Sequence, residues 1–167
     1  YRLESSIAVS RVQDYEFTDP IAAVEMYATY LRQNEGVDMV IAINHGNSSY
    51  TNSGIAALTG DARVDILFNG HSHSVYTNSI SREGLDMPVI QSGGYGSHVG
   101  LIDVTFDKTG LTAIDAVNVS NSSALMQQSS VEVSSVIQGY YDQIQPLLED
   151  EIIKSSQAYS SYQLTYY

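Results

Sequence analysis

Residues 64–73 read Val-Asp-Ile-Leu-Phe-Asn-Gly-His-Ser-His, so a short apolar run passes almost directly into two histidines. An apolar run of this length, rich in β-branched residues, is typical of a strand that is buried on both faces. Residues 39–43, Met-Val-Ile-Ala-Ile, repeat the pattern and are followed by His45. The sequence therefore predicts two buried strands that each deliver histidine at the carboxyl end.

Helical segments precede and separate these two strands. After residues 1–17, which read as irregular or a short strand, Thr18 or Asp19 can cap a helix that Gly36 is placed to end. Residues 46–53 have loop composition, and a short helix is expected at residues 55–58. The order helix, strand, loop, helix, strand predicts a parallel sheet with crossover helices.

The chain changes character after these elements. Residues 87–96 predict a further strand and a glycine-rich turn, and residues 99–119 predict an antiparallel hairpin. Residues 120–130 are dominated by Ser, Asn and Gln and read as a linker. An amphipathic helix is expected over residues 131–158, and Pro146 is expected to kink or interrupt it.

Composition narrows the classes of function. Seven basic residues against nineteen acidic ones give a formal charge of −12, which argues against binding to nucleic acid or to anionic membranes. No apolar run is long enough for a membrane span. The absence of cysteine excludes disulfides and thiolate metal sites. A small anionic substrate is still compatible with the charge, because bound metal ions can reverse the local field.

Three of the four histidines stand where predicted strands end. A single histidine there is more often a hydrogen-bonded loop residue than a metal ligand, but His71 and His73 lie two residues apart and form a stronger signal. His45 reaches the same edge of the sheet from another strand. Imidazole suits several divalent ions, so the histidines do not choose the metal. His98 is expected to be a packing or surface residue.

Three blocks of sequence together resemble the 5′-nucleotidase branch of the calcineurin-like metallophosphoesterases. Residues 69–73 resemble that family's Gly-Gly-His-Ser-His block. Residues 88–96, Pro-Val-Ile-Gln-Ser-Gly-Gly-Tyr-Gly, resemble its Pro-Val-Val-Gln-Ala-Gly-x-Tyr-Gly block. Residues 38–45 resemble the strand that delivers another metal-binding histidine. The resemblance extends over roughly residues 12–120.

The resemblance implies an α/β fold, part of a four-layer α-β-β-α sandwich with a mixed sheet and a C-terminal helix. Residues 1–120 would be the C-terminal half of the catalytic domain, followed by a linker at residues 121–130, an interdomain-type helix at residues 131–158 and a tail at residues 159–167.

The resemblance also implies a two-metal site for Zn, Mn or similar divalent ions. His45 and His71 would bind one ion and His73 the other, and Asn44 and Asn69 are candidates for orienting these ligands. The implied activity is that of a 5′-nucleotidase, which releases phosphate from nucleoside monophosphates.

The sequence departs from the family pattern in two ways. Gly46 follows His45 directly where the family has one intervening residue, and Asn69 replaces a glycine. The family's Asp-x-His pair, bridging Asp and Asn-His-Glu block are absent. We therefore expect the catalytic histidine and the remaining ligands in an N-terminal half, and substrate contacts in a C-terminal domain, both from the same or another chain. The fragment alone is expected to be inactive.

Two further interpretations stay open. The chain could retain the metallophosphoesterase fold as a structural or interaction protein without catalysis, or it could act on another phosphate ester such as a cyclic nucleotide or a nucleotide sugar. Family habit implies a periplasmic, secreted or cell-surface location. Glycosylation sequons at Asn47, Asn118 and Asn121 add only weak support, because such matches arise easily in a chain rich in Ser and Asn.

Overall fold

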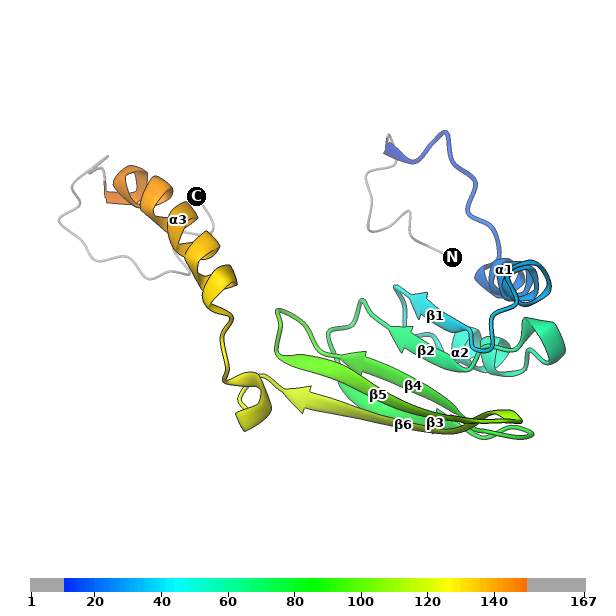
Figure 1. The fold of residues 1–167 in the computed structure, drawn as a ribbon. Helices are drawn as coiled ribbons and strands as arrows, with labels where there is room; N and C mark the ends of the chain where they lie inside the picture. Colours follow the sequence, from blue (N-terminus) through cyan, green and yellow to red (C-terminus); the bar gives the residue numbers. More distant parts are fainter. Residues whose placement is uncertain (1–10, 150–167) are drawn as a thin grey trace. The chain divides into compact units, whose positions relative to one another are not determined.

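The computed structural model describes residues 11–149 (Figure 1). It comprises two compact units, one up to Met126 and one from Gln127 onwards. Residues 1–10 of the segment read as irregular or a short strand lie outside the described residues, as do residues 150–158 of the predicted helix and the tail at residues 159–167.

Within the described residues, the first unit contains two helices and six strands, together with short 3₁₀ turns. In chain order they are α1 (Pro20–Glu35), β1 (Ile41–Asn44), α2 (Ser49–Ala56), a 3₁₀ turn (Gly60–Ala62), β2 (Ile66–Asn69), β3 (Val75–Ile80), β4 (Met87–Ser92), β5 (His98–Asp107), β6 (Gly110–Ser120) and a second 3₁₀ turn (Ala124–Met126). Four strands form a mixed sheet in the order β1-β2-β4-β3, in which only β3 is antiparallel to its neighbour. Strands β5 and β6 form a separate antiparallel hairpin.

Helix α1 begins and ends where the sequence predicts. The Asp19 carboxylate accepts a hydrogen bond from the backbone N–H of Ile21 at 2.8 Å, and Pro20 occupies the first turn. Gly36 ends the helix with a left-handed φ of 64°. These caps satisfy backbone groups that the helix itself leaves unpaired.

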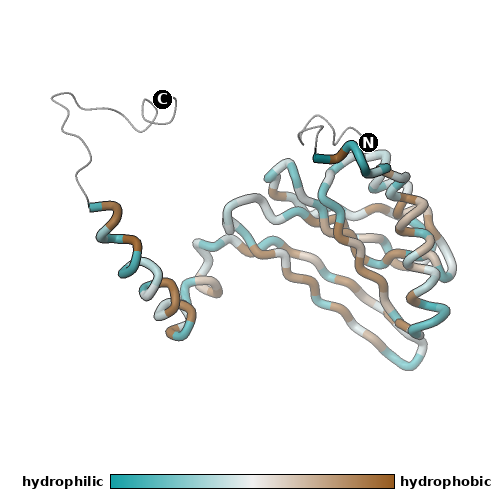
Figure 2. Tube along the Cα trace, turned by 90° about the horizontal axis from the view of Figure 1, so that it is seen from above, coloured by the Kyte–Doolittle hydropathy of each residue, from teal (hydrophilic) through white to brown (hydrophobic). Residues whose placement is uncertain are grey.

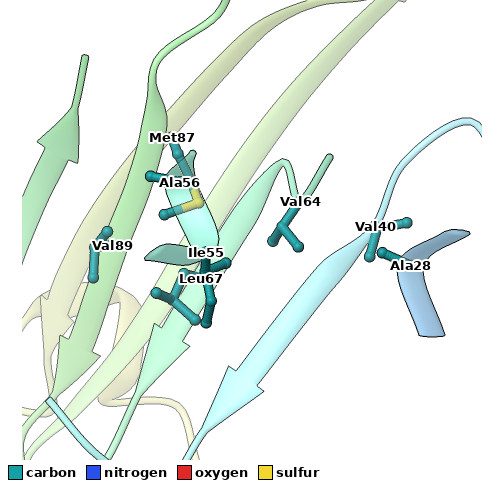
Figure 3. Close-up of a cluster of buried hydrophobic side chains, with 8 residues drawn as sticks. All are labelled: Ala28, Val40, Ile55, Ala56, Val64, Leu67, Met87 and Val89. Carbon is teal, nitrogen blue, oxygen red and sulfur yellow. The ribbon is translucent and has the colours of Figure 1, made fainter. Parts of the chain in front are cut away.

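One face of the mixed sheet packs against α1 and α2. Leu67 of β2 lies beside Val89 of β4 in register, and both are buried against Ile55 of α2. The full cluster comprises Ala28, Val40, Ile55, Ala56, Val64, Leu67, Met87 and Val89 (Figure 3). Burial of this apolar surface is the main force that fixes β2 and β4 in the centre of the sheet.

The opposite face of the sheet carries the β5–β6 hairpin. Gly100 of β5 lies so close to this face that an added Cβ would be 3.2 Å from both Ile90 and Phe68 and 2.7 Å from the Ser92 hydroxyl. Because these neighbours come from β4 and β2, the hairpin covers the middle of the sheet. The described part of the first unit thus has three layers: helices, mixed sheet and hairpin.

Replacing Gly100 with alanine is expected to destabilise the first unit by about 1–3 kcal/mol, because the added methyl group must displace packed side chains. The matched control is Gly139→Ala in helix α3 (Val131–Glu149), where nothing lies within 4 Å of an added Cβ. That change should cost nothing and should favour the helix by about 1 kcal/mol. Urea-induced unfolding measures both effects, and equal stability of the two variants would contradict the close approach at Gly100.

The prediction that the strand at residues 39–43 is buried on both faces is wrong. Strand β1 forms at Ile41–Asn44, but Ile41 is 46% exposed and Ile43 is 86% exposed. The physical reason is position: β1 is an edge strand, and the hairpin packs over β4, β2 and β3 instead. The strand predicted for residues 64–68 is confirmed as a buried strand, with Ile66 and Leu67 fully buried.

Two other elements differ from the prediction. Helix α2 begins at Ser49, inside the segment read as a loop, and ends at Ala56, halfway through the helix expected at residues 55–58. Thr51 and Ile55 are four residues apart and each 1% exposed, so packing of this face overrides the loop-like composition. Strand β3 was not predicted, because the exposed Asn78 interrupts the apolar alternation between its half-buried Tyr76 and Ile80.

The second unit contains helix α3 (Val131–Glu149), which continues past Pro146 without interruption. Its predicted apolar side is exposed: Val133, Ile137, Tyr140, Ile144 and Leu148 range from 45 to 76%. Figure 2 shows hydrophobic stretches recurring along the helix. Within residues 11–149, no helix is both long and apolar enough to cross a lipid bilayer.

Candidate metal centre

His45 and His71 are brought together by the pairing of two strands. Strands β1 and β2 are parallel, and Asn44 at the end of β1 lies beside Asn69 at the end of β2. The chain leaves both strands at the same edge of the sheet, so His45 and His71 meet there. Their ring centres are 5.3 Å apart and the ring planes are inclined by 77°. Both side chains are exposed to solvent at this edge.

A close backbone approach accompanies this meeting of rings. A Cβ added to Gly70 would lie 3.1 Å from Nδ1 of His45. A larger residue at position 70 would therefore push the His45 ring away. Glycine at position 70 thus leaves room for the His45 ring in the position that it has here.

His73 lies against the glycine-rich turn that follows β4. Its ring centre is 5.1 Å from that of Tyr95, with planes inclined by 77°, and a Cβ added to Gly94 would be 2.8 Å from its Cγ. The backbone N–H of Gly93 donates to the Ser74 carbonyl oxygen at 2.9 Å and ties the two loops together. The sequence blocks at residues 69–73 and 88–96 therefore meet at His73.

The described residues do not by themselves form a three-ligand metal site. Within residues 11–149, no three His, Cys, Asp or Glu side chains lie close enough to hold one ion. The structure brings His45 and His71 together as a pair, whereas His73 packs on the turn around Tyr95. One ion held by the pair would need further ligands from outside these residues.

Residues 70–74, here called the histidine loop, have a strained backbone. His71 and His73 have φ angles of 77° and 55°, and Tyr95 on the facing turn has 56°. Each residue with a side chain held in a sparsely populated region of this kind costs on the order of 1–3 kcal/mol. Strain of this size persists where surrounding contacts enforce it, and such residues cluster at functional sites.

The two asparagines lie directly beneath the histidine loops. The Asn44 amide nitrogen is 3.3 Å from the Asn69 amide oxygen and 3.3 Å from the Gly46 carbonyl oxygen, both within donating distance. Asn69 in turn donates to Asn52 of α2 at 3.1 Å and to the Tyr76 hydroxyl at 2.9 Å. These bonds hold the backbone at the ends of β1 and β2.

Sequence reasoning missed Gln91, which contacts the histidine loop from below. Gln91 ends the apolar run of β4, and its side chain is 1% exposed. With its amide oriented to satisfy both ends, the oxygen accepts from the backbone N–H of His73 at 2.9 Å and of Ser74 at 2.8 Å. The nitrogen donates to the Gly70 carbonyl oxygen at 3.1 Å. The available signal was one polar residue at the end of a buried strand, since buried amides are nearly always hydrogen-bonded.

The remaining histidine, His98, and the sequon residue Asn118 both make hydrogen bonds within the fold. His98 is half-buried, with Nδ1 3.1 Å from the Ser97 hydroxyl. The Asn118 amide nitrogen donates to the carbonyl oxygens of Tyr76 and Gln91 at 2.9 and 3.1 Å, and to the Thr77 hydroxyl. Asn118 is therefore engaged in joining β6 to β3 and β4, which removes it as a sugar acceptor in the folded chain.

The fold and the sequence both have relatives among known proteins. No model of a protein family matches the sequence. The chain is 26% identical over 151 residues to the endonuclease YhcR of Bacillus subtilis (strain 168), a match that covers 84% of this chain and 12% of that protein. Among solved structures it is similar to a Staphylococcus aureus protein assigned as a 5′-nucleotidase and crystallised with α-ketoglutarate. That match has a TM-score of 0.53 and 15% sequence identity, and covers 80% of this chain and 28% of the other.

These similarities confirm the predicted resemblance at the level of fold. The chain is α/β, with a mixed sheet and a C-terminal helix, and its fold matches part of a protein assigned as a 5′-nucleotidase. It spans less than a third of the length of each relative.

Proposed function

We propose that this chain is the histidine-bearing part of a two-metal phosphoester hydrolase, with His45 and His71 binding one divalent ion and His73 the other. The observation that carries the proposal is the meeting of His45 and His71 at the carboxyl ends of neighbouring parallel strands, with ring centres 5.3 Å apart. The carboxyl ends of strands are where open α/β sheets bind ligands.

The separation of the two rings suits a shared ion. Two imidazoles that bind one tetrahedral ion through bonds of about 2.0–2.1 Å have ring centres about 5 Å apart. Both side chains are exposed, so an ion can reach them without opening the fold. Imidazole nitrogen suits Zn and several other divalent ions, so the histidines are compatible with the proposed ions without selecting one of them.

The chain's own residues would bind and orient the ions, and the remaining groups would come from elsewhere. When bound, a pair of divalent ions supplies charge to clamp a phosphate ester and lowers the pKa of water for attack at phosphorus. His45, His71 and His73 would fix one side of that site. Bridging carboxylates, the catalytic histidine and the substrate-binding domain are proposed to lie outside these residues, in the same or another chain.

The proposed substrate is a nucleoside monophosphate. The structural similarity to a protein assigned as a 5′-nucleotidase supports this choice, and the formal charge of −12 disfavours a long polyanion. A phosphodiester within nucleic acid is the second candidate, because the sequence is similar to that of a protein named as an endonuclease. A fold retained without catalysis would hydrolyse neither class of substrate.

The test uses the full-length protein. Removal of metal with a chelator is expected to abolish release of phosphate from nucleoside monophosphates, and Zn or Mn should restore it. Parallel assays with single-stranded and double-stranded DNA and with RNA distinguish the two substrate classes. Metal-independent hydrolysis would overturn the two-metal proposal. A protein that binds no metal and hydrolyses no phosphate ester would instead be the structural alternative.

A further inference from the structure

We propose that Gln91 is a positioning residue that holds the loop carrying His71 and His73 in its ligand-presenting shape. This inference rests on the proposed function for the role of the histidines, but its geometric part can be tested without metal. It comes from the hydrogen bonds that one buried amide makes to a single loop.

The Gln91 side chain contacts the loop before, between and after the two histidines. Its nitrogen donates to the carbonyl oxygen of Gly70, and its oxygen accepts from the N–H groups of His73 and Ser74. The Ser72 hydroxyl lies 2.8 Å from the amide oxygen and 3.2 Å from the amide nitrogen. A neutral amide offers donors at one end and acceptors at the other, so it can hold both sides of a tight loop at once.

The loop needs such a contact because its shape is intrinsically unfavourable. Both histidines have left-handed φ angles, which side-chain-bearing residues rarely adopt. Inside the loop, the Ser72 N–H donates a hydrogen bond to the Gly70 carbonyl oxygen at 3.0 Å. The contacts from Gln91 therefore supply much of what enforces the conformation.

Gln91 is itself fixed from two directions. It lies in β4, paired with Tyr76 of β3, and its carbonyl oxygen accepts from the Asn118 amide of β6. The side chain is 1% exposed, so water does not compete for its amide. Rigid strands thus set the position of the amide, and the amide sets the position of the loop. Outer contacts of this kind orient the ligands of metal sites.

The test variant is Gln91→Met, which keeps much of the volume and removes the amide. In the metal-free full-length protein, the backbone amide hydrogens of His73 and Ser74 are expected to lose their protection from exchange, while those of β2 and β4 keep theirs. In the metal-loaded protein, affinity for Zn, measured by calorimetry, should fall by about 10–100-fold. The electronic spectrum of bound Co²⁺ should change as well.

Val89→Ala is the matched control, because it removes buried packing from the same strand without touching the loop. It should lower stability, yet leave metal affinity and the exchange of the two amides unchanged. Should Gln91→Met not fold, Gln91→Glu replaces it: its carboxyl oxygens still accept from the His73 and Ser74 N–H groups, so both amides should stay protected.

The outcomes separate this inference from the proposed function. Wild-type protein that binds no metal overturns the proposed function, while the exchange measurement still decides whether Gln91 holds the loop. Wild-type metal affinity in Gln91→Met, or unchanged protection at His73 and Ser74, overturns the inference about Gln91. In Gln91→Glu, the amides of His73 and Ser74 could lose protection to the same extent as amides throughout the core. That result would assign Gln91 a general structural role and overturn the inference as well.

Discussion

The double substitution His71→Asn and His73→Asn is expected to abolish both metal binding and phosphoester hydrolysis in the full-length protein. Loss of outer contacts alone typically costs about 10–100-fold in metal affinity or activity, and loss of direct ligands should exceed that range. Asparagine is chosen because it tolerates the left-handed backbone that both positions require. The variant therefore removes the imidazoles without adding strain.

The matched control for this experiment is His98→Asn. It removes the fourth histidine, which is half-buried near Ser97 and has no assigned role in the proposed centre. Activity and metal content should stay close to those of the wild type. Metal content is measured by elemental analysis and hydrolysis by release of phosphate. Undiminished metal content and activity in the double variant would show that His71 and His73 are not ligands.

The second large effect is expected for Asp65→Ala, which should destabilise the first unit by about 3 kcal/mol, because breaking a buried ion pair strands its partners. Asp65 is 4% exposed and accepts from Arg32 at 2.7 Å, from Arg63 at 3.2 Å and from the Val40 N–H at 2.9 Å. Alanine would leave two guanidinium groups and one backbone donor without this acceptor. The lower end of the usual range applies, because both arginines keep some contact with water.

A third arginine adds to this effect. Burial, followed by the positive charge of Arg63, lowers the pKa of Arg82 to about 10, and the charge of Asp65 opposes that shift. Removal of Asp65 therefore takes a favourable charge from a further cation. The control is Asp61→Ala, an exposed residue that accepts from Gln33, and it should change stability by no more than about 0.5 kcal/mol. Urea-induced unfolding measures both, and similar stabilities would contradict the assigned role of Asp65.

The helix at Pro20–Glu35 and the buried strands β2 and β4 were predictable because each carries a strong local signal. Capping residues mark the ends of α1, and continuous apolar runs mark the strands. The exposure of Ile43 was not predictable, because a run of apolar residues does not reveal which strand lies at the edge. Strand β3 depends on its ladder with β4, and α2 depends on packing of Thr51 and Ile55. Those contacts are absent from any local pattern.

In the candidate site too, features with a local sequence signal were predictable, and features that depend on contacts between distant residues were not. The sequence indicated His45, His71 and His73 through their places after strands and in motifs. It did not indicate that Gln91 supports the loop, since that contact joins residues about twenty positions apart through a β-strand pairing. Nor did it indicate the close approach of Gly70 to His45 or of Gly94 to His73. Contacts that leave room only for glycine beside a histidine ring from another part of the chain are visible only in three dimensions.

The left-handed backbone at His71 and His73 has a consequence for how this segment can change over generations. Mutations to glycine or asparagine would relax the loop and leave the fold intact, so selection for stability alone would drive both histidines out. A copy of the protein that no longer needs the proposed metal ligands should therefore change first at these two positions, before its core residues change. In this chain both imidazoles are still in place, at the positions that drift would vacate first.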